Sequence, residues 1–152
     1  MEIRLVRKSD CDLLYEWVNE KDVRKNSLNS DPIPYEVHKE WFHSMLIQSN
    51  VRIYIALHQQ IAIGMGRICM NDGIATVSYS IDKKFRGQGF GTQLISILTQ
   101  KIMDEHKEIK QIVGIVKMEN YASRQIFEKN GYIVRNSSIH KDTVEYILLM
   151  RD

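Results

Sequence analysis

A short glycine-rich run is the part of this sequence whose residue types most clearly suggest chemistry. Residues 86–91 read Arg-Gly-Gln-Gly-Phe-Gly and lie between a strand-like segment and an amphipathic helix-like one. Glycines allow positive φ angles and let the backbone approach a ligand closely. Backbone N–H groups at the start of a helix favour phosphate oxygens, and the cationic Arg86 adds charge. The run predicts a phosphate-binding loop; a plain tight turn is the alternative.

The spacing of these glycines separates the run from two common phosphate motifs. A dinucleotide fingerprint would need glycine at position 92, where Thr92 stands, and no Gly-Lys-Ser/Thr follows as a P-loop requires. The motif therefore indicates a phosphate ligand held in some other way.

The segment before the run has two unlike faces. Because side chains alternate along a strand, one face is bulky and apolar (Val77, Tyr79, Ile81) and the other small and hydroxylated (Thr76, Ser78, Ser80). Small hydroxyls can line a cleft without filling it. The alternative is an ordinary solvent-facing side of a sheet.

The rest of the chain supplies the elements that position these residues. Hydrophobic periodicity predicts strands at 3–6, 51–57, 61–70, 74–81, 111–116, 132–135 and 144–150, and helices around 9–18, 37–46, 89–105 and 121–130. The stretch 19–30 is polar and broken. We therefore expect an α/β fold with one mixed sheet, helices on both faces, and a single domain over residues 1–152.

Composition excludes several classes of protein. Hydrophobic residues make up 43% and charged residues 26% of the 152 positions, which are values of a globular domain. A formal net charge of +2 gives no argument for nucleic acid. The N-terminus is charged where a signal peptide needs an apolar run, and no stretch approaches the roughly 20 apolar residues of a membrane span. These features predict a cytoplasmic protein without a membrane partner.

Metal chemistry is not expected either. Cys11 and Cys69 stand far apart, and the five histidines form no HExxH or other ligand cluster. Two reduced thiols are the expected state of the cysteines, with one disulfide as the alternative.

Two motifs and the order of the elements resemble the GNAT superfamily of acyl-CoA-dependent N-acetyltransferases. The first family motif, Arg/Gln-x-x-Gly-x-Gly/Ala, is matched by Arg86, Gly89 and Gly91. The second is matched by Asn120, Ser123, Phe127, Gly131 and Tyr132. The resemblance covers essentially the whole chain.

This resemblance implies a largely antiparallel sheet of six or seven strands, splayed between the fourth and fifth. It also implies that acetyl-CoA is the co-substrate and that an amine attacks its thioester directly, with a backbone N–H near Ile81 polarising the carbonyl. The residues that it places at the cofactor are Ser80, Ile81, Arg86, Gly87, Gln88, Gly89, Phe90, Gly91, Asn120, Ser123 and Phe127.

The chain departs from the family pattern at two catalytic positions. Phe127 stands where many relatives have a tyrosine that protonates the CoA sulfur, and Ile115 stands where relatives that modify protein N-termini have a glutamate. Ser78 is the remaining candidate catalytic residue, with a positioning or proton-relay role; plain packing is the alternative. A CoA-binding module without catalysis is the alternative function.

The N-terminal segment resembles bacterial acetyltransferases that modify UDP-linked 4-amino sugars in pseudaminic acid biosynthesis. This resemblance implies a UDP-amino sugar as substrate, with Arg24, Ser27 and Trp41 as substrate-binding residues. An arginine can pair with phosphate through two hydrogen bonds, and a tryptophan can stack on a base or sugar. The alternatives are a buried Trp41, an ordinary basic surface at Arg24, and a protein N-terminal or ribosomal-protein acetyltransferase.

The last predicted hairpin is a candidate surface for a homodimer. It carries three apolar residues at alternate positions, Tyr146, Leu148 and Met150. Exposed apolar patches often mark contacts between proteins.

Overall fold

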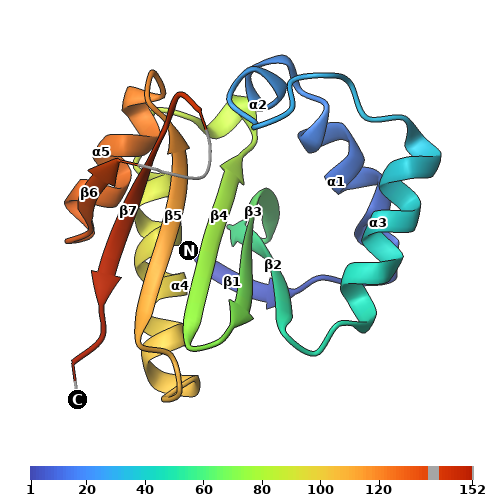
Figure 1. Ribbon diagram of the computed structural model, residues 1–152. Helices are drawn as coiled ribbons and strands as arrows, with labels where there is room; N and C mark the ends of the chain where they lie inside the picture. The colour runs from blue at the N-terminus through green and yellow to red at the C-terminus, as the bar shows by residue number, and fades with distance from the viewer. Residues whose placement is uncertain (137–140, 152) are drawn as a thin grey trace.

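The computed structural model of the protein describes residues 1–136 and 141–151. Seven strands form one sheet in the order β1-β2-β3-β4-β5-β7-β6, with helices on both faces (Figure 1). The strands are β1 (Glu2–Leu5), β2 (Val51–His58), β3 (Ile61–Asn71), β4 (Ile74–Ile81), β5 (Gln111–Lys117), β6 (Ile133–Asn136) and β7 (Thr143–Leu149). Only β4 and β5 pair in parallel, so the expected mixed and largely antiparallel sheet is confirmed.

Five α-helices are found in the described part of the chain. They are α1 (Cys11–Val18), α2 (Lys21–Lys25), α3 (Tyr35–Ile47), α4 (Phe90–Glu105) and α5 (Tyr121–Lys129), with 3-10 turns at Lys8–Asp10 and Lys83–Phe85. The short α2 lies inside the stretch expected to be broken. None of the helices in the described ranges is long and apolar enough to cross a membrane.

The antiparallel strands β2, β3 and β4 follow each other through tight turns. Asp72 and Gly73, between β3 and β4, both have positive φ angles, of 50° and 79°. Two consecutive positive angles are what a two-residue hairpin turn of type I′ requires, and Asp-Gly favours it. This turn lies at the end of β4 opposite to the glycine-rich run.

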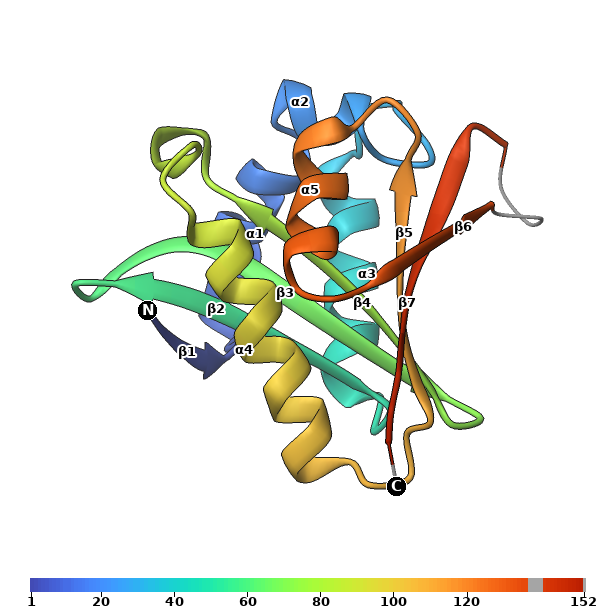
Figure 2. The same ribbon diagram turned by 90° about the vertical axis from the view of Figure 1, so that its left-hand side faces the viewer.

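The two faces of the sheet bury separate apolar clusters. Helices α4 and α5 cover one face, and α1 and α3 cover the other (Figure 2). The four-residue recurrence in α4 gives it a buried side, and Leu94, Leu98 and Ile102 are fully buried against the first face. Phe42 of α3 is fully buried on the second face with Trp17 and Leu14 of α1.

Of the three residues expected to mark a dimer surface, one is buried and two are half-buried. Tyr146 is fully buried, and Leu148 and Met150 pack against the α4-side cluster. Because strand side chains alternate, Leu149, the exposed residue of β7, lies on the other face of the strand. The expected patch is therefore partly covered by the fold, and the homodimer stays a prediction.

The sheet opens between β4 and β5. Their pairing contains only three residue pairs, from Ile74 with Gln111 to Thr76 with Val113. Beyond these pairs the strands diverge, and β4 runs obliquely to β5 and β7 in Figure 2. β4 stays paired with β3 up to Ile81, so one side of residues 77–81 has no strand neighbour. This confirms the expected splay.

Candidate active site

The glycine-rich run forms a loop that ends at the N-terminus of α4. Gly87 and Gly89 have φ angles of 76° and 85°, and Gly89 is the N-cap of the helix. Among the described residues, the N–H groups of Gly87, Gln88 and Gly89 donate to no backbone or side-chain acceptor. Unpaired amides at the positive end of a helix of 16 residues are a fitting site for a phosphate.

The third glycine of the run has a different role. A Cβ atom at Gly91 would lie 2.7 Å from Cδ1 of Ile126 and 3.2 Å from the ring of Tyr79. Gly91 is therefore needed for the close approach of α4 to α5 and β4. By contrast, a Cβ at Gly87 or Gly89 would meet no atom within 4 Å, so their backbone angles alone call for glycine.

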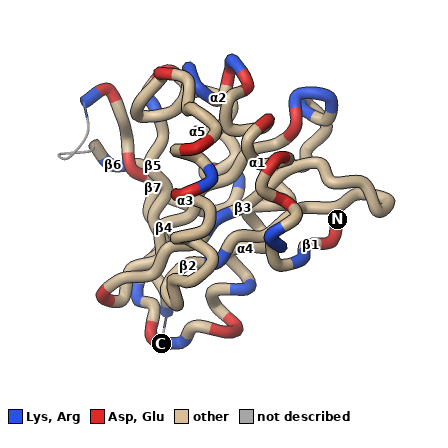
Figure 3. The backbone as a smooth tube through the Cα atoms, turned by 90° about the vertical axis from the view of Figure 1, so that its right-hand side faces the viewer, with Lys and Arg blue, Asp and Glu red and all other residues tan. Residues whose placement is uncertain are grey.

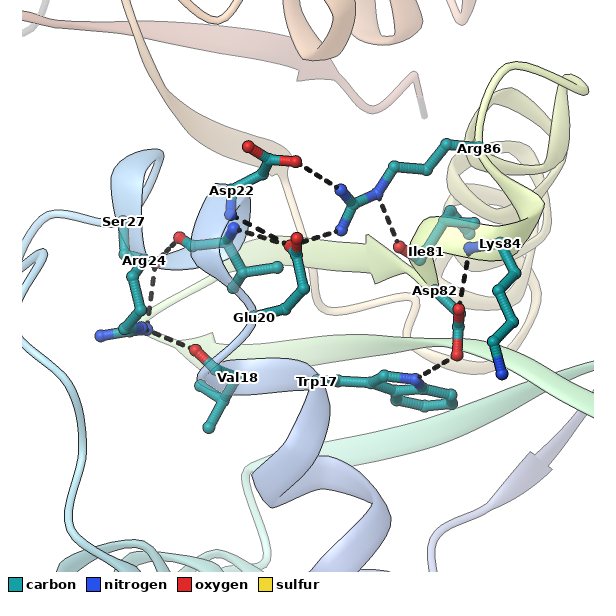
Figure 4. A network of polar contacts seen from close by, with 11 residues as sticks. Trp17, Val18, Glu20, Asp22, Arg24, Ser27, Ile81, Asp82, Lys84 and Arg86 are labelled. Atoms are coloured by element: carbon teal, nitrogen blue, oxygen red, sulfur yellow. Dashed lines mark hydrogen bonds and ion pairs between the residues drawn. The ribbon is translucent and has the colours of Figure 1, made fainter.

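Arg86 connects the glycine loop to the N-terminal segment. Its Nη2 lies 2.9 Å from Oε2 of Glu20, its Nη1 lies 3.2 Å from Oδ2 of Asp22, and its Nε donates to the carbonyl of Ile81 (Figure 4). Burial alone would raise the pKa of Glu20, but hydrogen bonds from Arg86 and from two backbone amides lower it overall. The charge of Arg86 is thus balanced by α2 rather than free for a phosphate.

A second polar link joins α1 to the same loop. The indole Nε1 of Trp17 donates to Oδ2 of Asp82 at 2.9 Å, and the other oxygen of Asp82 accepts from the Lys84 amide (Figure 4). Trp17 is only 7% exposed. Asp82 was not singled out by the sequence reasoning, because its partner lies 65 positions away.

The second motif caps α5 and ties it to β4. The side-chain oxygen of Asn120 accepts from the Ser123 amide at 3.2 Å, and the hydroxyl of Ser123 accepts from Tyr79 at 2.9 Å. Ser123 is 8% exposed. Burial raises the pKa of Tyr79 above its usual value, so this phenol stays protonated at neutral pH. The Asn120 side-chain oxygen and the Ser123 hydroxyl oxygen therefore both accept hydrogen bonds from within the protein.

Phe127 and Phe90 do not lie at the surface of the site. Phe127 is 2% exposed, its ring leaves no room for a Cβ atom at Gly114, and it stacks on Tyr146 with ring centres 5.7 Å apart. The Phe90 ring is 8% exposed and packs on His58. Both aromatic rings therefore belong to the core in this structure, and contact of Phe127 and Phe90 with the cofactor stays a prediction.

The other face of β4 is open where the strands diverge. Ser78 is exposed and stands opposite Arg67 of β3, and Ser80 stands opposite Met65. Arg67 places its guanidinium carbon 5.5 Å from the ring centre of Trp41, a residue of α3. The structure thus brings Ser78 and Trp41 to one face, with Arg67 between them. The sequence reasoning missed Arg67.

Arg24 and Ser27 hold a loop together. Arg24 donates to the carbonyl of Val18 and to the hydroxyl of Ser27 (Figure 4). It also donates to the carbonyls of Asn29 and Asp31. Ser27 in turn donates to the carbonyl of Val23 at 2.6 Å. The expected phosphate contact of Arg24 would require it to release these bonds. In this structure both residues therefore shape the loop after α2.

An open hollow of about 560 Å³ lies beside the glycine loop. Its lining residues come from α4 and from the end of α5: Gly89, Thr92, Gln93, Ser96, Ile97, Lys129 and Asn130. Lys129 is exposed and supplies the cation of this surface. Acidic and basic residues lie close together at α2 (Figure 3). No group of His, Cys, Asp and Glu within residues 1–136 and 141–151 could hold a metal ion, and His140 lies outside these ranges.

A mixed sheet that splays after three parallel pairs, with a glycine loop leading from β4 into a helix N-terminus, defines the GNAT class of fold. The sequence profile of the acetyltransferase (GNAT) domain family matches residues 1–133. The chain belongs to this family.

The comparisons also find more distant similarities. Aminoglycoside N(6')-acetyltransferase type 1 of Klebsiella pneumoniae is 23% identical over 146 residues, covering 86% of this chain and 72% of the relative. The structure of aminoglycoside acetyltransferase AAC(6')-Ib with coenzyme A and kanamycin superposes with a TM-score of 0.84 at 21% identity, over 97% of this chain and 93% of the other. Spermidine N-acetyltransferase of Vibrio cholerae, with coenzyme A and spermine, gives 0.86 at 16% identity, over 97% and 94%. These structures share the fold.

Proposed function

We propose that this chain transfers the acetyl group of acetyl-CoA to a primary amine of a UDP-linked amino sugar. The use of acetyl-CoA as the donor is supported above all by the unpaired backbone amides of Gly87, Gln88 and Gly89. CoA contains a diphosphate, which such a helix start binds well. The hollow beside the loop, with Lys129 at its edge, offers room and charge for the nucleotide end.

The splay between β4 and β5 supports the position of the acyl group. With the diphosphate at the glycine loop, the pantetheine arm would follow residues 80–81, where β4 has no neighbour on one side. The amine nitrogen attacks the thioester carbon, the C–N bond forms, and the C–S bond breaks. The sulfur leaves as thiolate, which needs no dedicated acid because thiols ionise near pH 8.5. The proton of the new ammonium passes to water through Ser78.

The amino-sugar part of the proposal is supported by the N-terminal segment and by Trp41. The segment resembles enzymes of UDP-linked 4-amino sugars, and Trp41 presents a partly exposed ring on the open face of the sheet. An aromatic ring packs well against a sugar or a base. A second candidate is an aminoglycoside amine, which the name of the Klebsiella pneumoniae relative favours. One alternative acceptor outside the small-molecule amines is a protein N-terminus. The other alternative is that the protein binds CoA without catalysing a reaction.

A matched pair of glycine variants tests the coenzyme site. Gly89 and Gly73 have φ angles of 85° and 79°, and a Cβ at either would meet no atom closer than 3.7 Å. Alanine therefore strains both backbones alike, but only Gly89 belongs to the loop. By calorimetry, Gly89→Ala should weaken acetyl-CoA binding at least ~10-fold, as expected when amides that hold a charged group are misplaced. Gly73→Ala should bind as the wild type does; equal binding by all three proteins contradicts the site.

A panel of amines tests the substrate. The wild-type protein is incubated with acetyl-CoA and a UDP-4-amino sugar, kanamycin, spermidine or a peptide N-terminus, and released thiol is followed. Turnover with the UDP-amino sugar above all others is the expected result. Preference for kanamycin would instead support the second candidate. Binding of acetyl-CoA without turnover of any amine would support a binding module.

A further inference from the structure

Arg67 is the one residue on the open face of β3 and β4 that carries a full charge. It stands opposite Ser78 in the antiparallel register, and it is partly exposed. Its neighbours on the same face of β3, Met65 and Cys69, pack into the apolar cluster below α1 and α3. Arg67 therefore lies at the boundary between this cluster and the open side of the splay.

The guanidinium of Arg67 is held in place but is not neutralised. The ring of Trp41 lies 5.5 Å from its central carbon, which is within the range of a cation–π contact. Within the described ranges, no carboxylate oxygen lies within the 4.0 Å limit of an ion pair with Arg67. Arg4 and Arg86, by contrast, are each paired with an aspartate or a glutamate.

A positioned arginine without a counter-ion is well suited to bind an anion. Its planar fork of N–H donors matches the oxygens of a phosphate, and stacking on an aromatic ring leaves the edge of the fork available. The Arg24 fork, expected to do this, is occupied by backbone carbonyls. Arg67 offers the donors that Arg24 does not.

We propose that Arg67, backed by Trp41, binds a phosphate of the acceptor substrate and so selects anionic amines over polycationic ones. The inference deepens the proposed function and rests on it for the identity of the acceptor side. Ser78, directly across from Arg67, then lies between the bound anion and the splay where the amine must arrive. A polycationic amine such as spermidine would be repelled by the same charge.

The first test measures binding and needs no turnover. Binding of UDP and of uridine, which lacks the phosphates, is followed by calorimetry and by quenching of tryptophan fluorescence. Wild-type protein should bind UDP about tenfold more tightly than uridine, the usual size of a charge-assisted contact. Arg67→Gln should remove this difference, and Arg67→Lys, which keeps the charge without the fork, should retain part of it. Trp41→Phe should reduce the fluorescence response.

Arg52→Gln is the matched control for these variants. Arg52 is on the neighbouring strand β2 but lies next to Ile68 in the register, on the α4 side of the sheet. It should leave the preference for UDP unchanged. Thermal melting of each variant establishes that it is folded; if Arg67→Gln is not, Arg67→Lys carries the comparison. No binding of millimolar UDP by the wild type, or equal binding by wild type and both Arg67 variants, overturns the proposal.

An activity arm separates this inference from the proposed function. If the wild type acetylates the UDP-amino sugar, and Arg67→Gln raises the KM for this sugar about tenfold with little change in kcat, then both the proposed function and the role of Arg67 are supported. If KM is unchanged in Arg67→Gln, the role of Arg67 is wrong while the proposed function stands. If UDP binding depends on Arg67 but no amine is acetylated, the inference about Arg67 stands and the proposed function fails.

Discussion

Arg86 of the glycine loop and Glu20 at the start of α2 form an ion pair, with 2.9 Å between Nη2 and Oε2. The same Glu20 oxygen accepts hydrogen bonds from the amides of Asp22 and Val23, so it also caps α2. The helix that borders the acceptor side and the loop expected to bind diphosphate therefore share one carboxylate. A negative ligand at the loop must compete with this carboxylate for Arg86.

Glu20→Gln tests that competition. Glutamine keeps an oxygen for the α2 cap but loses the charge, so Arg86 keeps only Asp22 as an acidic partner and is more available to a phosphate. We expect acetyl-CoA to bind about 2–5-fold more tightly, which corresponds to a partly exposed ion pair of up to ~1 kcal/mol. Calorimetry at low and high salt measures this. Glu16→Gln, an exposed glutamate of α1, is the control, and unchanged or weaker binding by Glu20→Gln would contradict the competition.

Ser78→Ala tests the role of the exposed hydroxyl on β4. If Ser78 positions the amine or passes its proton, turnover should fall at least ~10-fold while acetyl-CoA binding changes little. Steady-state kinetics with the best amine of the panel and calorimetry give the two quantities. Ser49→Ala, an exposed serine before β2, should leave both unchanged. Wild-type turnover of Ser78→Ala would leave Ser78 no catalytic role.

Gly114→Ala tests the packing of Phe127 on β5. The added methyl group would overlap the buried ring, and such overpacking lowers the free energy of unfolding by about 1–3 kcal/mol. Urea denaturation measures the loss. The double variant Gly114→Ala/Phe127→Leu should be more stable than the sum of the two single effects, because removing the ring removes the overlap. Strict additivity would show that the two residues do not interact.

Asp10→Asn tests a pH-dependent contribution to stability. Asp10 is buried and accepts two hydrogen bonds from Arg4, at 2.8 and 2.9 Å, and these lower its pKa below the ordinary 3.8. A depressed pKa stabilises the folded state above pH 3.8, and the contribution is lost as the pH falls through the folded-state value. At pH 7 the free energy of unfolding of the wild type should exceed that of Asp10→Asn by about 1–3 kcal/mol. This difference in the free energy of unfolding should shrink as the pH is lowered toward 3. A difference independent of pH would contradict this origin.

The parts of the fold that follow local rules were predictable from the sequence. The four-residue recurrence of Leu94, Leu98 and Ile102 predicts α4, and the glycines predict the loop before it, because both depend on near neighbours. The helix α2 was not predictable, since its cap Glu20 is fixed by Arg86, 66 positions away. Arg67 was missed for the same reason, because nothing local shows that Trp41 lies over it.

The short joint between β4 and β5 has a consequence for how the protein moves. Strands β1–β4 and strands β5–β7 form two parts of the sheet, which are joined by only three residue pairs between β4 and β5. A rotation of one part against the other disturbs few backbone hydrogen bonds. We therefore expect the gap between β4 and β5 to open and close. A ligand bound along residues 77–81 would contact both parts of the sheet and limit this motion. Its binding should therefore slow amide hydrogen exchange in β5, which is far from the glycine loop in sequence.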